Sequence, residues 1–175
     1  MARKSKKISE SRTVMTEIIM PNDTNPINNL MGGNLMRWMD IVSAICAGKH
    51  CEHHVVTVSV DNVSFDKPVP VGDVITLQAV VTRAFSTSVE IFVEVFAANM
   101  QGGNSRRCND AYFTFVAVDD SKKRPQAIPA VLPLTAEELK RYDEALQRRQ
   151  LSLLLAKKLP PEKAQKIKAE LIQNL

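Results

Sequence analysis

The chain has 175 residues, 45% of them hydrophobic, which suits one domain with an extension. No run of about 18 apolar residues occurs, so we expect no membrane span. The N-terminal MARKSKKISESR lacks an apolar segment, so we expect no secretory signal and a cytoplasmic location. The net charge is +4, yet residues 13–120 carry twelve acids and six bases, which argues against nucleic-acid binding through the domain.

The chain begins with two segments of different character. Residues 1–12 are rich in Lys and Arg, and we expect a disordered basic tail. The segment RTVMTEIIM at residues 12–20 contains several β-branched residues and predicts a first strand, which ends at the turn at Pro21.

A polar loop at residues 21–33 is followed by an apolar segment without proline, which predicts a loop and then a buried helix. The apolar positions cover most of the helix circumference, so we expect it to be enclosed on nearly all sides and to end near Ala47–Gly48. Four polar residues step by three along it and predict one polar stripe: Asn34, Arg37, Asp40 and Ser43.

Asp40 is then an acid on the most apolar helix of the chain, where a carboxylate is costly unless it is hydrogen-bonded or paired. It suits either an ion pair with Arg37 or a catalytic role. Gly32 and Gly33 favour the catalytic role, because they allow a ligand to approach the first helical amides, which have no internal partners. A carbonyl oxygen or oxyanion can bind there, although Gly-Gly alone also suits a simple turn or cap.

The sequence HCEHH at residues 50–54 contains potential zinc ligands. Four donors within five residues do not easily surround one ion, and the sequence has no second cluster, so we expect a polar connection without a metal. The odd number of cysteines, without paired spacing, predicts reduced thiols: Cys46, Cys51 and Cys108.

Four alternating segments predict strands at residues 55–65, 74–85, 88–98 and 106–118. In the first, Val56, Val58 and Val60 are expected on one apolar face, opposite Thr57, Ser59 and Asp61. One helix with this antiparallel sheet predicts an α+β domain at residues 13–120. The exposed edges of such a sheet favour dimerisation.

The end of the chain has a different composition. Residues 121–134 are charged and contain proline, which predicts a linker. Thr135 with Glu138 predicts a capping box for a helix to about Lys158, and a short amphipathic helix is expected at 162–174. The apolar stripe is too weak to fold alone, so we expect residues 135–175 to form a helical extension that packs on neighbouring subunits.

The segments PNDTNPINNLMGGNLMRWMD, VVTVSVDNVSFDKPVPVGDVITLQAVVTRAFSTSVEIFVEVFA and DAYFTFVAVD closely resemble the acyl-CoA thioesterases of the hot-dog fold, the hexameric bacterial enzymes and their tandem-domain cytosolic relatives in animals. The resemblance covers residues 13–120. It implies a curved antiparallel sheet wrapped around one long central helix. It also implies hydrolysis of acyl-CoA to fatty acid and coenzyme A without a further cofactor, and a homo-oligomer that is at least a dimer and, by family habit, a trimer of dimers.

The same resemblance implies that Asn25 and Asp40 are catalytic and meet across a dimer interface. No serine-hydrolase motif is present, so the backbone amide of Gly33 is expected to polarise the thioester oxygen, and Asp40 to act as general base or as nucleophile. Asn25 orients water or thioester, unless it only caps the loop, since Asn-Pro is a common turn pair. Candidates for binding the phosphates and the pantetheine arm of coenzyme A are Arg83, Arg106 and Arg107, and Ser86, Thr87 and Ser88.

Two other functions fit the same sequence. One is a hot-dog protein that binds acyl-CoA or acyl carrier protein without hydrolysis, or a dehydratase, although a dehydratase needs a catalytic histidine and His50, His53 and His54 lie beyond the polar stripe. The other is an interaction protein that acts through its basic ends. Trp38, Met36 and Met39 suit either an acyl tunnel or the core.

Overall fold

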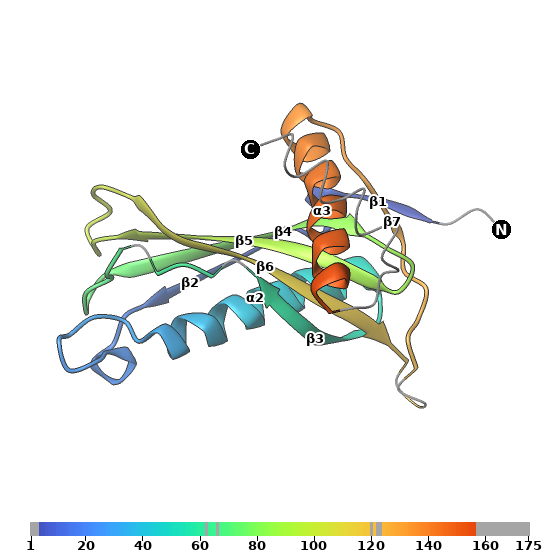
Figure 1. Cartoon of the computed structure of the whole chain (residues 1–175). Coiled ribbons are helices and arrows are strands. Elements are labelled where there is room, and N and C mark those ends of the chain that lie inside the picture. The colour runs from blue at the N-terminus through green and yellow to red at the C-terminus, as the bar shows by residue number, and fades with distance from the viewer. Residues whose placement is uncertain (1–3, 62, 66, 120, 122–123, 157–175) are drawn as a thin grey trace. The chain divides into compact units, whose positions relative to one another are not determined.

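The computed structural model describes residues 4–61, 63–65, 67–119, 121 and 124–156, and the chain divides into two units, Met1–Leu132 and Pro133–Leu175. The first unit contains a five-stranded antiparallel sheet in the order β2-β4-β5-β6-β3 (Figure 1). The strands are β2 (Thr13–Ile18), β3 (His54–Asp61), β4 (Val74–Ala84), β5 (Ser88–Ala98) and β6 (Arg106–Val118). The α+β arrangement predicted from the sequence is confirmed.

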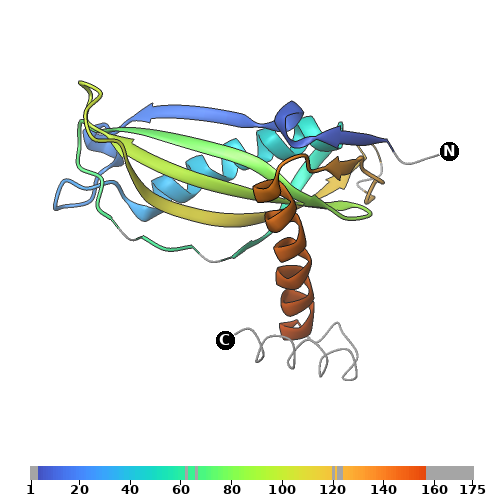
Figure 2. The same cartoon turned by 90° about the horizontal axis from the view of Figure 1, so that it is seen from above.

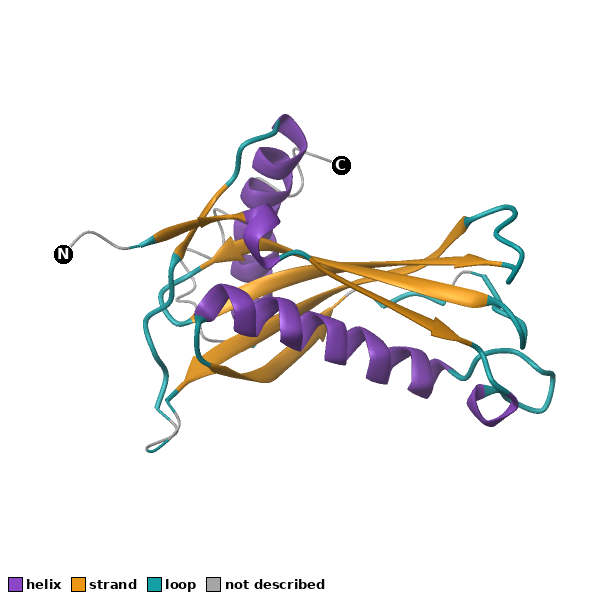
Figure 3. Cartoon of the chain, turned by 180° about the vertical axis from the view of Figure 1, so that it is seen from behind, coloured by secondary structure: helices purple, strands orange, loops and turns teal. Residues whose placement is uncertain are grey.

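The long helix α2 (Gly32–Cys51) lies along one face of this sheet, as Figure 3 shows. Its buried side includes Leu35, Trp38, Met39, Val42 and Cys46, which pack on the inward side chains of the strands. These inward side chains alternate along each strand, for example Ala111, Phe113, Phe115 and Ala117 on β6, all fully buried. Trp38 and Met39 therefore belong to the core.

The helix is not enclosed on nearly all sides, so this expectation was wrong. Arg37 and Lys49 are exposed, and the side chain of Ile45 is 45% exposed. The reason is geometric: a single five-stranded sheet covers one face of a helix and leaves the opposite face to solvent. An apolar residue on that open face indicates a surface that a further protein layer can cover.

The predicted polar stripe was also wrong. A step of three residues turns a helix by about 300°, so the direction drifts by roughly 60° at each step and reverses between Asn34 and Ser43. Asn34 accordingly lies near the loop, where its Nδ2 contacts Asp23 Oδ1 at 3.4 Å, whereas Ser43 is fully buried. The Ser43 hydroxyl has no hydrogen-bond partner among the described residues.

Helix α2 continues four residues beyond the predicted end at Ala47–Gly48. Gly48 is tolerated inside the helix, and the chain turns only at Glu52, whose φ of 58° is left-handed. The Glu52 amide donates to the Gly48 carbonyl at 2.9 Å, and Lys6 Nζ donates to the Lys49 carbonyl at 2.7 Å. These bonds satisfy carbonyls that a helix C-terminus leaves without partners.

Strand β3 contains a bulge between Thr57 and Ser59 that changes which side chains share a face. Thr57 is opposite Phe115 and Val60 is opposite Phe113, so Thr57 and Val60 both point toward α2. The predicted single face of Val56, Val58 and Val60 was therefore wrong. Val56 and Val58 are 49% and 60% exposed on this edge strand.

The N-terminal residues form regular structure where a disordered tail was expected at 1–12. β1 (Ser5–Lys7) pairs in parallel with β7 (Ala130–Leu132), and α1 (Ile8–Ser11) follows it (Figure 2). Lys4 and Lys6 form ion pairs with Glu52 at 2.6 and 2.8 Å. Part of the predicted linker at 121–134 is thus a strand. The sequence did not predict it, because its partner strand is more than a hundred residues away along the chain.

The second unit contains α3 (Ala136–Leu155), which starts as predicted. Thr135 Oγ1 accepts from the Glu138 amide at 3.1 Å, and Glu138 Oε2 accepts from the Thr135 amide at 3.0 Å. The helix expected at 162–174 lies outside the described residues. Within the described part of the chain, no helix is long and apolar enough to cross a membrane.

Candidate active site

Asp40 lies on α2 beside the edge strand β3, and Thr57 Oγ1 donates a hydrogen bond to Asp40 Oδ1 at 2.8 Å. The carboxylate is half-buried and Thr57 is exposed, so the pair is accessible to solvent in a single chain. Sequence reasoning missed Thr57, because the bulge that turns it toward α2 leaves no clear mark in the alternation. The hydroxyl fixes one carboxylate oxygen, and Oδ2 is left for another contact.

The alternative structural role of Asp40, an ion pair with Arg37, does not occur in the described structure. Arg37 is exposed on the outer face of α2, and no salt bridge joins the two side chains. Asp40 is therefore oriented by a neutral hydroxyl and keeps its charge available.

The N-terminus of α2 has no side-chain cap. Met31 is the N-cap residue, and the first internal bond runs from the Leu35 amide to the Met31 carbonyl at 3.1 Å. No acceptor among the described residues contacts the backbone amides of Gly32, Gly33 and Asn34. A Cβ added at Gly33 would meet no atom within 4 Å, so space is open beside these amides. An uncapped helix start of this kind favours an anionic or carbonyl oxygen.

Asn25 lies in the loop before α2, where its side-chain oxygen accepts from the amides of Ile27 and Asn29, both at 3.1 Å. The oxygen thus performs the loop-capping role considered from the sequence. Its Nδ2 has no partner among the described residues and can still donate to a ligand. The loop is fixed to the start of α2 by the bond from the Met31 amide to the Asp23 carbonyl at 2.9 Å.

The residues considered for coenzyme A divide between two ends of the sheet. Ser86 and Thr87 lie in the β4–β5 turn and Ser88 begins β5, next to Arg83, whose guanidinium lies 5.8 Å from the centre of the Phe85 ring. Arg106 and Arg107 pair with Ala97 and Phe96 at the far end of β5. At 3.3 Å per residue the two groups are roughly 20–30 Å apart along β5, so one chain does not bring them together.

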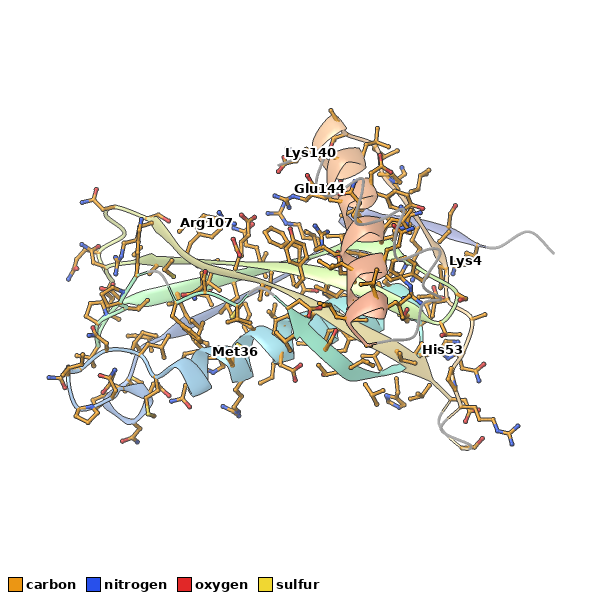
Figure 4. All side chains as sticks on the ribbon, in the orientation of Figure 1. Lys4, Met36, His53, Arg107, Lys140 and Glu144 are labelled. Carbon is orange, nitrogen blue, oxygen red and sulfur yellow. The ribbon has the colours of Figure 1, made fainter. Side chains whose placement is uncertain are left out.

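The two arginines at the far end of the sheet are already paired with acids. Arg106 forms an ion pair with Asp73 at 2.7 Å, and Arg107 pairs with Glu94 at 3.2 Å and also with Asp110. Figure 4 shows Arg107 far from Lys4 and His53. These pairs neutralise Arg106 and Arg107, which weakens the expectation that they bind phosphate.

Comparisons with known proteins identify the family of the chain. A family model described as Thioesterase superfamily matches residues 27–103. An uncharacterized acyl-CoA thioester hydrolase of Bacillus subtilis (strain 168) is 38% identical over 139 residues, which are 79% of this chain and 80% of the relative. The chain belongs to the hot-dog acyl-CoA thioesterases. The fold expected from the resemblance is thereby confirmed.

Solved structures of this thioesterase family extend the likeness. The acyl-CoA hydrolase from Staphylococcus aureus, in complex with butyryl coenzyme A, coenzyme A and coenzyme A disulfide, is 32% identical with a TM-score of 0.78 and covers 97% of both chains. An apo hexameric acyl-CoA thioesterase is also 32% identical, with a TM-score of 0.78, and covers 95% of this chain and 97% of the other. Three further structures of the S. aureus hydrolase carry alanine in place of an aspartate, an asparagine or a threonine.

The segment HCEHH belongs to the other end of α2 in this thioesterase. His50 is fully buried, with Ser11 Oγ 3.3 Å from Nδ1 and the Pro129 carbonyl oxygen 3.1 Å from Nε2. A carbonyl oxygen only accepts, so Nε2 carries a proton and donates it to the Pro129 carbonyl. The described residues contain no group of three or more His, Cys, Asp or Glu side chains that could hold a metal.

A shallow depression of about 480 Å³ is lined by Gly48, Glu52, His53, His54, Asp119 and Ser121, away from Gly33. The cysteines are free and buried, and burial raises the pKa of Cys46 and Cys51 to about 12 and the pKa of Cys108 above its usual value. Their thiols are therefore protonated near neutral pH and are poor nucleophiles.

Proposed function

We propose that the chain hydrolyses acyl-CoA thioesters to a carboxylic acid and coenzyme A, in a site that two copies of the chain complete. The observation that carries the proposal is the Asp40 carboxylate, which is held by Thr57 on the open face of α2 and is not neutralised by Arg37. The names of the relatives support the substrate class, because they act on acyl-CoA thioesters.

The need for two copies follows from distances along α2. Gly33 and Asp40 are seven residues apart, so they lie on the same helix face but roughly 10 Å apart along the axis. A thioester carbonyl within hydrogen-bond distance of the Gly33 amide is therefore out of reach of the Asp40 of the same chain. Two α2 helices packed antiparallel through their open faces would place the amide of one chain opposite the carboxylate of the other.

The surface around Asp40 suits such an arrangement. Val56 and Val58 on the edge strand β3 are exposed, as is Ile45 on α2, and an unpaired edge strand can pair with a second copy. A hexameric relative supports a trimer of such dimers for this chain. A relative described as cytosolic, from Mus musculus, supports a cytoplasmic setting.

The roles follow from donors and acceptors. The thioester oxygen accepts from the Gly33 amide, and the dipole of α2 stabilises the negative charge that develops there. Asn25 Nδ2 donates to the thioester or to the attacking water. As a base, Asp40 takes a proton from that water, whose oxygen adds to the carbonyl carbon; the C–S bond then breaks and coenzyme A leaves as the thiol with that proton. As a nucleophile, Asp40 attacks the carbonyl carbon and expels coenzyme A thiolate to form an anhydride, which water then hydrolyses to the carboxylic acid and free Asp40. Thr57 keeps the carboxylate in position for both.

The substituted positions in the S. aureus hydrolase support this set of residues. Its asparagine and aspartate are 15 residues apart and its aspartate and threonine 17, which are the separations of Asn25, Asp40 and Thr57.

For binding coenzyme A, the group of residues at the β4–β5 turn is the better candidate. The two arginines at the other end of the sheet, Arg106 and Arg107, are neutralised by acids.

The test is release of free coenzyme A from a panel of acyl-CoAs, followed with a thiol reagent. Asp40→Asn keeps the shape of the side chain and removes the base, so we expect a loss of about 100- to 10,000-fold in kcat with an unchanged oligomer and melting temperature. Asp61→Asn, which changes an exposed acid on β3, the edge strand that carries Thr57, is the matched control and should retain activity. Turnover near wild type in Asp40→Asn would remove Asp40 from the mechanism.

A further inference from the structure

The two glycines at the start of α2 have different surroundings. A Cβ at Gly33 would meet nothing within 4 Å, whereas a Cβ at Gly32 would lie 3.1 and 3.2 Å from Cε1 and Cζ of Phe65. Cβ contacts this close are rare in proteins, so the ring occupies the space that a side chain at position 32 would need. Gly32 is therefore matched to Phe65, and Gly33 is left open for a ligand.

Phe65 is not a core residue, because 57% of its surface is exposed. The loop that carries it is nevertheless held on both sides. The buried Asn109 side chain donates through Nδ2 to the Ser64 carbonyl, and the Leu30 amide donates to the Val69 carbonyl at 2.8 Å. An exposed aromatic ring that is held in place beside open amides is suited to contact a ligand.

The distances allow that contact. Covalent geometry places a Cβ at Gly32 roughly 3 Å from the next amide nitrogen, so the ring edge lies within roughly 6 Å of the Gly33 nitrogen. A thioester oxygen bound to that nitrogen would be roughly 2.9 Å from it. An acyl group oriented toward Phe65 can therefore bring the atoms bonded to the carbonyl carbon within van der Waals distance of the ring.

We propose that Phe65 determines specificity by contacting the acyl α-carbon, so that straight acyl chains are accepted and α-branched chains are disfavoured. This inference rests on the proposed function. Of the two groups on a thioester carbonyl, the acyl side is hydrocarbon at its first carbon, which matches an apolar ring. A methyl branch on that carbon would need the volume that the ring fills.

The test compares butyryl-CoA with isobutyryl-CoA, which have the same number of carbons and differ by branching at the α-carbon. For the wild type we expect kcat/KM to be at least about tenfold higher for butyryl-CoA, since one misplaced methyl group changes this ratio by about 10- to 200-fold. In Phe65→Ala the preference should fall below about threefold. Gly32→Ala should also lower it, because the new Cβ displaces the ring.

Met100→Ala is the matched control, since it shortens an apolar side chain that is 65% exposed in the β5–β6 turn, and it should keep the wild-type preference. Equal preferences in the wild type and in Phe65→Ala, at equal melting temperatures, would overturn the proposal. So would a wild type that does not discriminate.

A binding measurement separates this inference from the proposed hydrolysis. Dissociation constants of the two acyl-CoAs are measured by calorimetry on Asp40→Asn, with and without Phe65→Ala. If the wild type releases no thiol, the proposed function fails, while the ratio of the two constants still decides the role of Phe65. A ratio that Phe65→Ala leaves unchanged would contradict that role.

Discussion

The two ends of α2 differ in whether their terminal backbone groups have hydrogen-bond partners. At the C-terminal end, the Glu52 cap and the Lys6 side chain satisfy terminal carbonyls, and His50 is buried between Ser11 and Pro129. At the N-terminal end, the amides of Gly32 and Gly33 have no acceptor among the described residues, and space is open beside Gly33. The C-terminal end of α2 therefore contributes to stability, and we expect the N-terminal end to leave its backbone amides for a ligand.

The largest effect that this comparison predicts is on stability at the C-terminal end. His50→Ala removes a fully buried ring and its contacts with Ser11 and Pro129, so we expect the free energy of unfolding to fall by about 2–4 kcal/mol. Denaturant unfolding measures this, and the kcat of the folded enzyme should change little. His53→Ala, an exposed neighbour, is the control. A large loss of kcat in folded His50→Ala would contradict the proposal that the C-terminal end of α2 serves stability and the N-terminal end serves the ligand.

The next effect concerns catalysis. Thr57→Val keeps the shape of the side chain and removes the donor to Asp40, so we expect kcat to fall about tenfold, the usual worth of a hydrogen bond to a charged group. Thr57→Ser keeps the hydroxyl and should retain most of the activity. The melting temperature should not change by much, because Thr57 is exposed on an edge strand. Equal kcat in the Val and Ser variants would contradict the role of Thr57.

A smaller effect compares two buried serines. The Ser43 hydroxyl has no partner in the part of the chain that the structure describes, whereas Ser11 contacts His50. Removing an unsatisfied buried hydroxyl removes its desolvation cost, so Ser43→Ala should stabilise the chain by about 1 kcal/mol, and Ser11→Ala should destabilise it by a similar amount. Thermal unfolding of both variants checks the signs. Destabilisation by both would show that Ser43 has a partner in solution.

The smallest effect is a pH dependence at the N-terminal segment. Hydrogen bonds from Lys4 and Lys6 lower the pKa of Glu52 from its usual 4.5 to about 2. A lowered carboxyl pKa stabilises the folded state above pH 4.5, and this stabilisation is lost as the pH falls from 4.5 to 2. We expect the amide NMR signals of Ser5–Lys7 to shift over that interval, and those of Glu52→Gln to lack the step. An identical step in Glu52→Gln would assign it to another group.

Much of this fold could be predicted from local patterns. The long strands β4, β5 and β6 were predicted to within one residue, because hydrophobic residues recur at alternate positions along each of these sequences. Features that depend on distant partners were missed. β1 is a strand only because β7 pairs with it, and α2 passes the expected stop at Gly48 because Glu52 caps it later.

The candidate site shows the same limit. The loop, the glycines and Asp40 were identified from one contiguous stretch, residues 20–47. Thr57 was missed, because only the bulge in β3 turns it toward Asp40, and Phe65 was missed, because nothing in the sequence places its ring against Gly32. Whether Asn25 and Asp40 act together depends on a second chain, and a single sequence shows no such contact.

The most direct test of the composite site mixes two inactive variants. Asn25→Ala and Asp40→Asn chains are unfolded together in equal amounts and refolded, and mixed oligomers are verified by native mass spectrometry. If Asn25 of one chain acts with Asp40 of the other, half of the dimers are mixed and each has one intact site, so about a quarter of wild-type activity should return. Verified mixed oligomers that stay as inactive as either variant alone would contradict the account.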